Sequence, residues 1–230
     1  MTNWRSRIGL VPGAMLLLAV ASGCESDMTG VITKDVQSFR RIEQSPTPVP
    51  RELIDRARGI AIFSSTQAGV VVGGKGGVGV FLKRLDEGFS PPLAVDLIQG
   101  SIGLQIGAQS EDSVFVFLTD EAVDRFLTKG RYAVAQAAGS FGDGSGTTDP
   151  VDLPRDEVRV FTDAVGVYGG LVVGGSGFTI DEALNRRTYG KDVTTDMIVN
   201  GKVEAPPGTR VLWKLLEGSS AKEPTGTSGG

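Results

Sequence analysis

The sequence predicts an α+β fold, built on a glycine-rich, curved, mainly antiparallel β-sheet with a few short flanking helices. Its β-branched runs, Ile60–Phe63, Val70–Val72 and Val78–Phe81, are separated by glycines, which is typical of short strands joined by tight turns. The pattern Gly-Val-Val-Val-Gly-Gly at 69–74 returns as Gly-Leu-Val-Val-Gly-Gly at 170–175, as a repeated unit or by chance composition. Because glycine weakens a strand, its repetition indicates bends or close backbone approach, and it leaves open whether the sheet closes like a barrel.

Composition removes several classes of function. The 230 residues allow one good-sized hydrophobic core or two small ones. A net charge of −4 with a pI near 5.0 lacks the excess of basic residues that is typical of nucleic-acid-binding proteins. The chain has no histidine, and its one cysteine is Cys24. Histidine triads, cysteine nucleophiles within the fold, histidine- or cysteine-ligated metals and intrachain disulfides are therefore excluded.

The N-terminus is similar to a bacterial lipoprotein signal. Arg5 and Arg7 precede an apolar run over Ile8–Val20, and Ala-Ser-Gly at 21–23 comes directly before Cys24. The alternative is an ordinary signal peptide with an incidental cysteine. We expect cleavage after residue 23 and acylation of Cys24, with palmitate among the acyl groups, which anchors a protein without a transmembrane helix. Since Glu25 is not the inner-membrane retention aspartate, we expect the outer membrane, facing the periplasm, in a bacterium with two membranes.

We divide the mature chain into a tether at 24–49, a domain at 50–217 and a disordered tail at 218–230. Ile32, Val36 and Phe39 give the tether a short amphipathic helix before a proline-rich break. This helix lies either on the membrane surface or packed on the domain, and the sequence does not choose between the two.

Further elements follow from caps and breakers. Pro50 begins a helix that ends at Gly59, Thr119 or Asp120 caps another that ends at Gly130, and residues 142–157 form a polar loop. A capping box over 179–182 begins a helix through residue 187, and Thr194 or Thr195 starts a last short helix. The remaining strands are expected through residue 107 and over 114–118, 158–162 and 167–173, with 210–216 closing the fold.

Motifs that suggest catalysis have simpler structural explanations. The Gly-x-Gly-x-x-Gly match over 74–79 continues as a strand instead of opening a helix, and Gly76 stands where a Walker loop needs serine or threonine. Paired acids such as Asp120-Glu121 and Asp181-Glu182 fit helix starts, and adjacency in sequence does not place carboxylates across a cleft. We therefore expect no enzyme, no nucleotide and no cofactor.

Five blocks together resemble the SYLF domain family, also described as a yeast-type actin-binding domain. They lie at 50–63, 68–80, 103–108, 166–170 and 185–191, within a similarity that covers about residues 48–200. The resemblance implies a non-catalytic domain that binds lipid through basic residues and an amphipathic N-terminal helix. This chain departs from the family at Gln67, where a lysine is frequent, and at Phe89 and Gly174.

These observations predict a lipid-anchored envelope protein whose SYLF-like domain binds phospholipid at the membrane surface. The alternative is an envelope scaffold or protein-interaction module with the anchor as its only membrane contact. We do not expect actin as a partner of an exported bacterial protein. Besides the lipid on Cys24, the candidate headgroup-binding residues are cations, namely Lys34, Arg40, Arg41, Lys75, Lys83 and Arg84.

Overall fold

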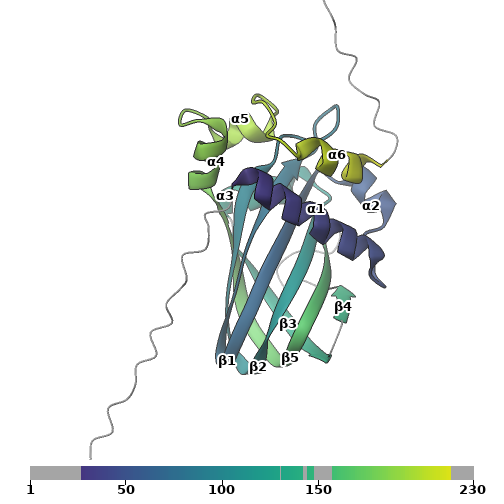
Figure 1. Cartoon of the computed structure of the whole chain (residues 1–230), viewed down its shortest axis with the longest axis vertical. Coiled ribbons are helices and arrows are strands. Elements are labelled where there is room, and N and C mark those ends of the chain that lie inside the picture. Colours follow the sequence, from purple (N-terminus) through teal and green to yellow (C-terminus); the bar gives the residue numbers. More distant parts are fainter. Residues whose placement is uncertain (1–26, 130, 142–143, 148–156, 219–230) are drawn as a thin grey trace, which may run out of the picture.

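The computed structural model describes residues 27–129, 131–141, 144–147 and 157–218, which form one folded sheet with helices gathered at one end (Figure 1). The helices are α1 Met28–Gln44, α2 Arg51–Arg56, α3 Asp120–Lys129, α4 Glu182–Tyr189, α5 Thr195–Val199 and α6 Thr209–Glu217. The strands are β1 Gly59–Lys83, β2 Leu93–Phe117, β3 Arg131–Phe141, β4 Gly144–Thr147 and β5 Val158–Ile180. Among these described elements, no helix has the length and apolar character needed to cross a membrane.

The sheet is antiparallel throughout, with the order β1-β2-β5-β3 and with β4 also paired to β5. The predicted α+β class is confirmed. Closure into a barrel, which the glycine pattern left open, does not occur among the described strands, because the path ends at β1 on one side and β3 on the other.

The prediction of three short strands joined by tight turns over residues 60–81 is wrong. β1 is a single strand of 25 residues, paired with β2 from Gly59↔Phe117 to Phe81↔Leu93, with one register shift between Val70 and Val72. The glycines remain in the ladder, as Gly74↔Gly100 shows, because pairing with β2 keeps their backbone extended. The separate strands predicted at 114–118 and 167–173 are likewise parts of the long β2 and β5.

Glycines allow β1 to fold back on itself. A Cβ atom built on Gly79 would overlap the carbonyl oxygen of Ile62, and one on Gly77 would lie 2.7 Å from the carbonyl oxygen of Ser64. These residues are far apart in one strand, so its two halves lie against each other. The close backbone approach that the glycine repetition predicted is therefore confirmed at these positions.

Two hydrophobic clusters hold the helices to the sheet. In the first, α1 packs on β1 and on α6, and the cluster includes Phe39, Ile62 and Leu212, each fully buried. The second is aromatic and includes Phe126 of α3, whose ring centroid lies 4.8 Å from that of Phe81 and 5.2 Å from that of Phe178. Burial of such rings contributes to the stability of the helical end.

Helix α1 packs on the domain, which decides between the two interpretations of the amphipathic segment. Asp27 caps the helix by accepting a hydrogen bond from the Gly30 N–H at 2.7 Å. Its apolar side, including Ile32 and Phe39, is buried in the first cluster together with strands of the sheet. The apolar face is therefore not available to lie in a membrane while the helix is docked.

The other predicted helices are present, with changes at their ends. Thr119 accepts a hydrogen bond from the Ala122 N–H at the start of α3, and Thr194 caps α5, as expected. The residue that caps α4 is Asp181, not Thr179. The polar loop predicted over 142–157 contains strand β4, since Gly144–Thr147 pairs with β5, and most of its remaining residues lie outside the described ones.

Candidate functional site

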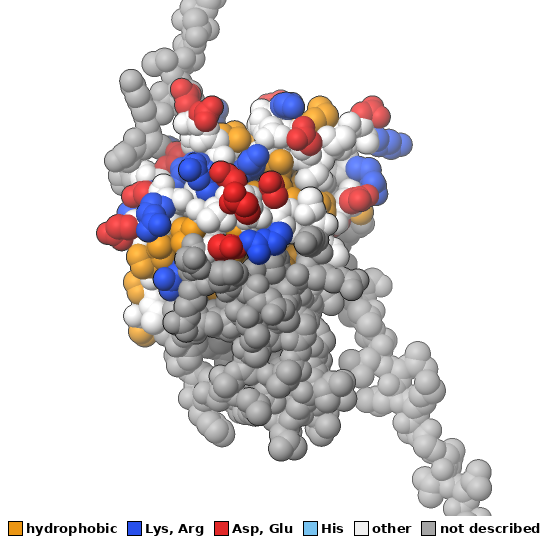
Figure 2. Space-filling model, turned by 180° about the vertical axis from the view of Figure 1, so that it is seen from behind, with side chains coloured by type: hydrophobic (Ala, Val, Ile, Leu, Met, Phe, Trp, Pro, Cys, Tyr) orange, Lys and Arg blue, Asp and Glu red, His pale blue; other side chains and the backbone are white. Residues whose placement is uncertain are grey.

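The outward side of α1 is cationic. Lys34, Arg40 and Arg41 are exposed, and Glu43 is the one exposed acid of the helix. This arrangement follows from the helical period, because the apolar residues occupy the opposite side and are buried. The three α1 cations of the sequence prediction are thus displayed on one rigid helix. By contrast, Figure 2, which views the molecule from behind, shows acidic and basic side chains interspersed over the helical end.

Arg41 is also tied to the sheet. Its Nε donates a hydrogen bond to Oδ2 of Asp112 at 2.5 Å, and its Nη2 donates to Oγ of Ser38 at 3.2 Å. Ser38 in turn donates to Oδ1 of Asp112 at 2.7 Å. The hydrogen bond with Asp112 raises the pKa of the Arg41 guanidinium, so Arg41 stays positively charged. The Asp112 carboxylate of β2 compensates part of that charge.

Beneath the same helix lies a buried acid that sequence reasoning missed. Asp35 is fully buried, and neither carboxylate oxygen has a hydrogen-bond partner among the described residues. Burial raises the pKa of Asp35 well above its ordinary value; the nearby backbone N–H of Val80 lowers it in part, and the charge of Asp112 raises it further. The available sequence signal was an acid between Ile32 and Phe39, on the apolar side of the helix.

The second group of predicted cations has structural contacts. Lys83 Nζ donates to Oδ1 of Asn200, after α5, at 3.2 Å. Arg84 donates to the carbonyl oxygens of Ile54 at 2.7 Å and Ala57 at 3.3 Å, and its guanidinium lies 3.8 Å from the ring centroid of Phe89. Burial lowers the pKa of Arg84. These contacts connect Lys83 and Arg84 to α5 and α2, and a headgroup role for them stays a prediction.

The side chains of two predicted site residues, Lys75 and Cys24, are not among those that the structure describes. Lys75 pairs with Gln99 in the β1–β2 ladder, in a part of the strand whose side chains are not described. Cys24 lies outside the described residues. Among the residues that are described, no group of three or more His, Cys, Asp or Glu side chains is placed to hold a metal ion.

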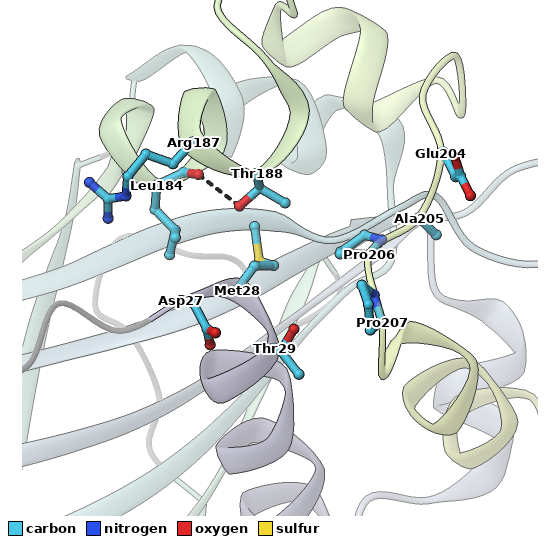
Figure 3. A pocket seen from close by; sticks show the side chains of 10 residues that line it. All are labelled: Asp27, Met28, Thr29, Leu184, Arg187, Thr188, Glu204, Ala205, Pro206 and Pro207. Atoms are coloured by element: carbon cyan, nitrogen blue, oxygen red, sulfur yellow. Dashed lines mark hydrogen bonds between the residues drawn. The ribbon is translucent and has the colours of Figure 1, made fainter.

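A pocket of about 470 Å³ opens beside the first turn of α1 (Figure 3). Helix α4 lines one side, the segment 204–207 lines the other, and α1 contributes its first residues. Its polar lining consists of Asp27, Thr29, Arg187, Thr188 and Glu204, and its apolar lining consists of Met28, Leu184, Ala205, Pro206 and Pro207. Sequence reasoning did not find this pocket, because its three segments are distant in the chain.

A folded, glycine-rich antiparallel sheet with its helices at one end, and with a cationic N-terminal helix docked on it, defines an α+β domain. The chain belongs to the Ysc84 family, described as "Las17-binding protein actin regulator", whose family model matches residues 98–219. The resemblance inferred from the five sequence blocks is thereby confirmed.

Relatives in yeast and mammals support the assignment. Protein YSC84 of Saccharomyces cerevisiae is 31% identical over 74% of this chain and 37% of its own length. LAS seventeen-binding protein 3 of the same species is 29% identical over 74% of this chain and 38% of its own. Human SH3 domain-containing YSC84-like protein 1 is 29% identical over 82% of this chain and 57% of its own.

The chain therefore spans between about a third and three fifths of the length of these relatives. LAS seventeen-binding protein 3 is named for binding, and none of the three names states an enzymatic activity. No solved structure matches the chain.

Proposed function

We propose that this protein is a non-catalytic, lipid-anchored component of the bacterial cell envelope whose SYLF domain binds phospholipid surfaces. The acyl groups on Cys24 hold it at the membrane, in the outer membrane facing the periplasm where the source has two membranes. The domain adds a second, electrostatic contact through the outward side of α1. One lipid signal plus a cationic surface is a combination that gives stable membrane attachment.

The observation that carries this proposal is the docking of α1. Because the apolar side is buried against the sheet, Lys34 and Arg40 are held outward on a fixed helix instead of on a mobile chain. Each cation near an anionic surface contributes about 1 kcal/mol, so these two residues together strengthen binding by roughly thirtyfold. Arg41 contributes less because Asp112 compensates its charge.

Co-sedimentation with vesicles tests the proposal. The mature chain without its lipid, residues 25–230, is mixed with anionic or with neutral liposomes at low and at high salt. We expect pelleting with anionic vesicles that falls as salt rises, since exposed charges are screened beyond about 10 Å at 0.1 M salt. Absence of pelleting with either vesicle would remove the electrostatic contact and leave Cys24 as the sole membrane attachment.

The second candidate function is an envelope scaffold or protein-interaction module. It is favoured by the names of the relatives, which assign Las17 binding to those proteins. Under this alternative, membrane association disappears completely when Cys24→Ser removes the lipid. We still do not propose actin as a partner of this chain, although the family description includes an actin regulator.

A further inference from the structure

The folded domain begins very close to the predicted anchor. Asp27 caps α1, and the helix is docked from its first residue, with Met28 3% and Val31 2% exposed. Asp27 is three positions after Cys24, with only two residues between them in the sequence. A fully extended chain spans at most ~3.6 Å per residue, so the backbone of Cys24 lies within about 11 Å of Asp27.

This short connection restricts how the domain can be oriented. A flexible tether over residues 24–49 would have allowed separations of roughly 30 Å, leaving the domain free to turn. The polar layer on each side of a bilayer is only about 5–8 Å thick. With acyl chains on Cys24 inserted below that layer, the part of the domain around Asp27 has to lie at the headgroups.

The part of the domain around Asp27 is the pocket shown in Figure 3. We call this surface the anchor face and define it by the polar pocket residues Asp27, Thr29, Arg187, Thr188 and Glu204. The lining includes the Arg187 guanidinium and the Thr29 hydroxyl, which suit a phosphate, and the carboxylates of Asp27 and Glu204, which suit an ammonium group. The Thr188 hydroxyl already donates to the carbonyl oxygen of Leu184, at 2.8 Å. Both signs of charge in one opening match a zwitterionic headgroup better than an anionic one.

We infer that the anchor face lies against the bilayer and that its pocket receives zwitterionic phospholipid headgroups. This inference rests on the lipidation of Cys24 proposed above. It deepens that proposal, because it specifies which side of the domain meets the membrane. Helix α2 lies at the opposite end of the helical layer from α4 (Figure 1).

Cysteine labelling of the lipidated full chain in vesicles tests the orientation. The only natural cysteine is Cys24, whose acylated sulfur does not react with a maleimide, so a single new cysteine is read without background. Glu204→Cys reports the anchor face, and Thr29→Cys on the same face repeats the measurement in case the first variant folds poorly. Glu52→Cys on α2 is the matched control, since Glu52 and Glu204 are both exposed glutamates.

The probe is a membrane-impermeant maleimide, and the vesicles contain phosphatidylethanolamine and phosphatidylcholine at high salt. At residue 204, labelling in vesicles is expected to be about tenfold slower than in detergent, as for a site that is exposed ~10% of the time. At residue 52, the labelling rate is expected to be the same in vesicles and in detergent. Equal rates at the two positions in vesicles overturn the inference. A protein that does not float with the vesicles lacks the lipid on Cys24, which instead contradicts the proposed function.

Discussion

Arg41 of α1 and Asp112 of β2 form a hydrogen-bonded ion pair, with Nε and Oδ2 2.5 Å apart, although they are far apart in the sequence. Ser38 bridges the same carboxylate, so one acid of the sheet holds two residues of the helix. This contact joins the N-terminal segment to the sheet by a polar link in addition to apolar packing. It also explains why one of the three cations of α1 is less available to a membrane.

Replacing Asp112 should destabilise the domain more than replacing Arg41, although both changes break the same ion pair. We expect Asp112→Ala to lower the free energy of unfolding by about 2–3 kcal/mol, because charged hydrogen bonds to Ser38 and Arg41 are lost. The Arg41 side chain is 45% exposed, so Arg41→Ala should cost only about 1 kcal/mol. Urea denaturation measures both, with Arg40→Ala as a neighbouring control within ±0.5 kcal/mol. A smaller effect for Asp112→Ala than for Arg41→Ala would contradict this order.

Replacement of Asp35 should stabilise the protein at neutral pH. A buried carboxyl group whose oxygens lack hydrogen-bond partners is unfavourable in the core, so Asp35→Leu is expected to raise the free energy of unfolding by about 1–3 kcal/mol. Thermal unfolding at pH 7 is the measurement. Ser38→Ala, which changes a neighbouring buried residue without removing an acid, is the control and should be destabilising. A destabilised Asp35→Leu protein would show that an unseen partner satisfies the carboxylate.

The pH dependence of stability should carry the signature of the same residue. Its pKa is raised in the folded state, so the unfolded state releases the Asp35 proton first as pH rises. The contribution of this pKa shift of Asp35 to the free energy of unfolding is therefore complete below the unfolded pKa of about 3.9. It is lost as pH increases from there through the folded pKa. Chemical denaturation at several pH values should show this loss in the natural chain and a flatter profile in Asp35→Leu. Parallel profiles would exclude Asp35 as the source.

The folded-back strand predicts a strong contrast between two glycines of β1. Gly79→Ala would place a methyl group on the carbonyl oxygen of Ile62, so we expect a loss of about 2–4 kcal/mol. Gly76→Ala meets no atom within 4 Å and should change stability by about 0.5 kcal/mol or less. Melting temperatures compare the two directly. Similar values for both variants would show that the halves of β1 are not in contact.

Charge reversal on α1 tests the membrane contact. The double variant Lys34→Glu and Arg40→Glu should lose salt-sensitive binding to anionic vesicles, since two attractions of about 1 kcal/mol each become repulsions. Lys214→Glu, an exposed cation on α6, is the matched control with the same change per site. Co-sedimentation gives the bound fraction, and an equal loss in the control would indicate an effect of net charge instead of a defined surface.

Much of the fold followed from local patterns, because caps and periodicity act over a few residues. The glycine repetition predicted an antiparallel sheet with close backbone approach. Caps were predicted at residues 119 or 120 and at 194 or 195, and the structure selects Thr119 and Thr194. The three short strands were wrong because Gly74 and its neighbours look like turn residues in isolation. Only their pairing with β2 keeps them extended.

Some features of the candidate site could likewise be predicted from the sequence, and others depend on the tertiary structure. The sequence by itself determined the family resemblance, the cationic residues of α1 and the position of Cys24 directly after the Ala-Ser-Gly run at 21–23, since each is a pattern of neighbouring residues. Tertiary structure decided that α1 docks with Asp35 buried, that Arg41 pairs with Asp112, and that Arg84 contacts α2. The pocket also belongs to this second group, because it joins α1, α4 and the segment 204–207. Such contacts depend on how a folded sheet brings distant segments together, which no local spacing encodes.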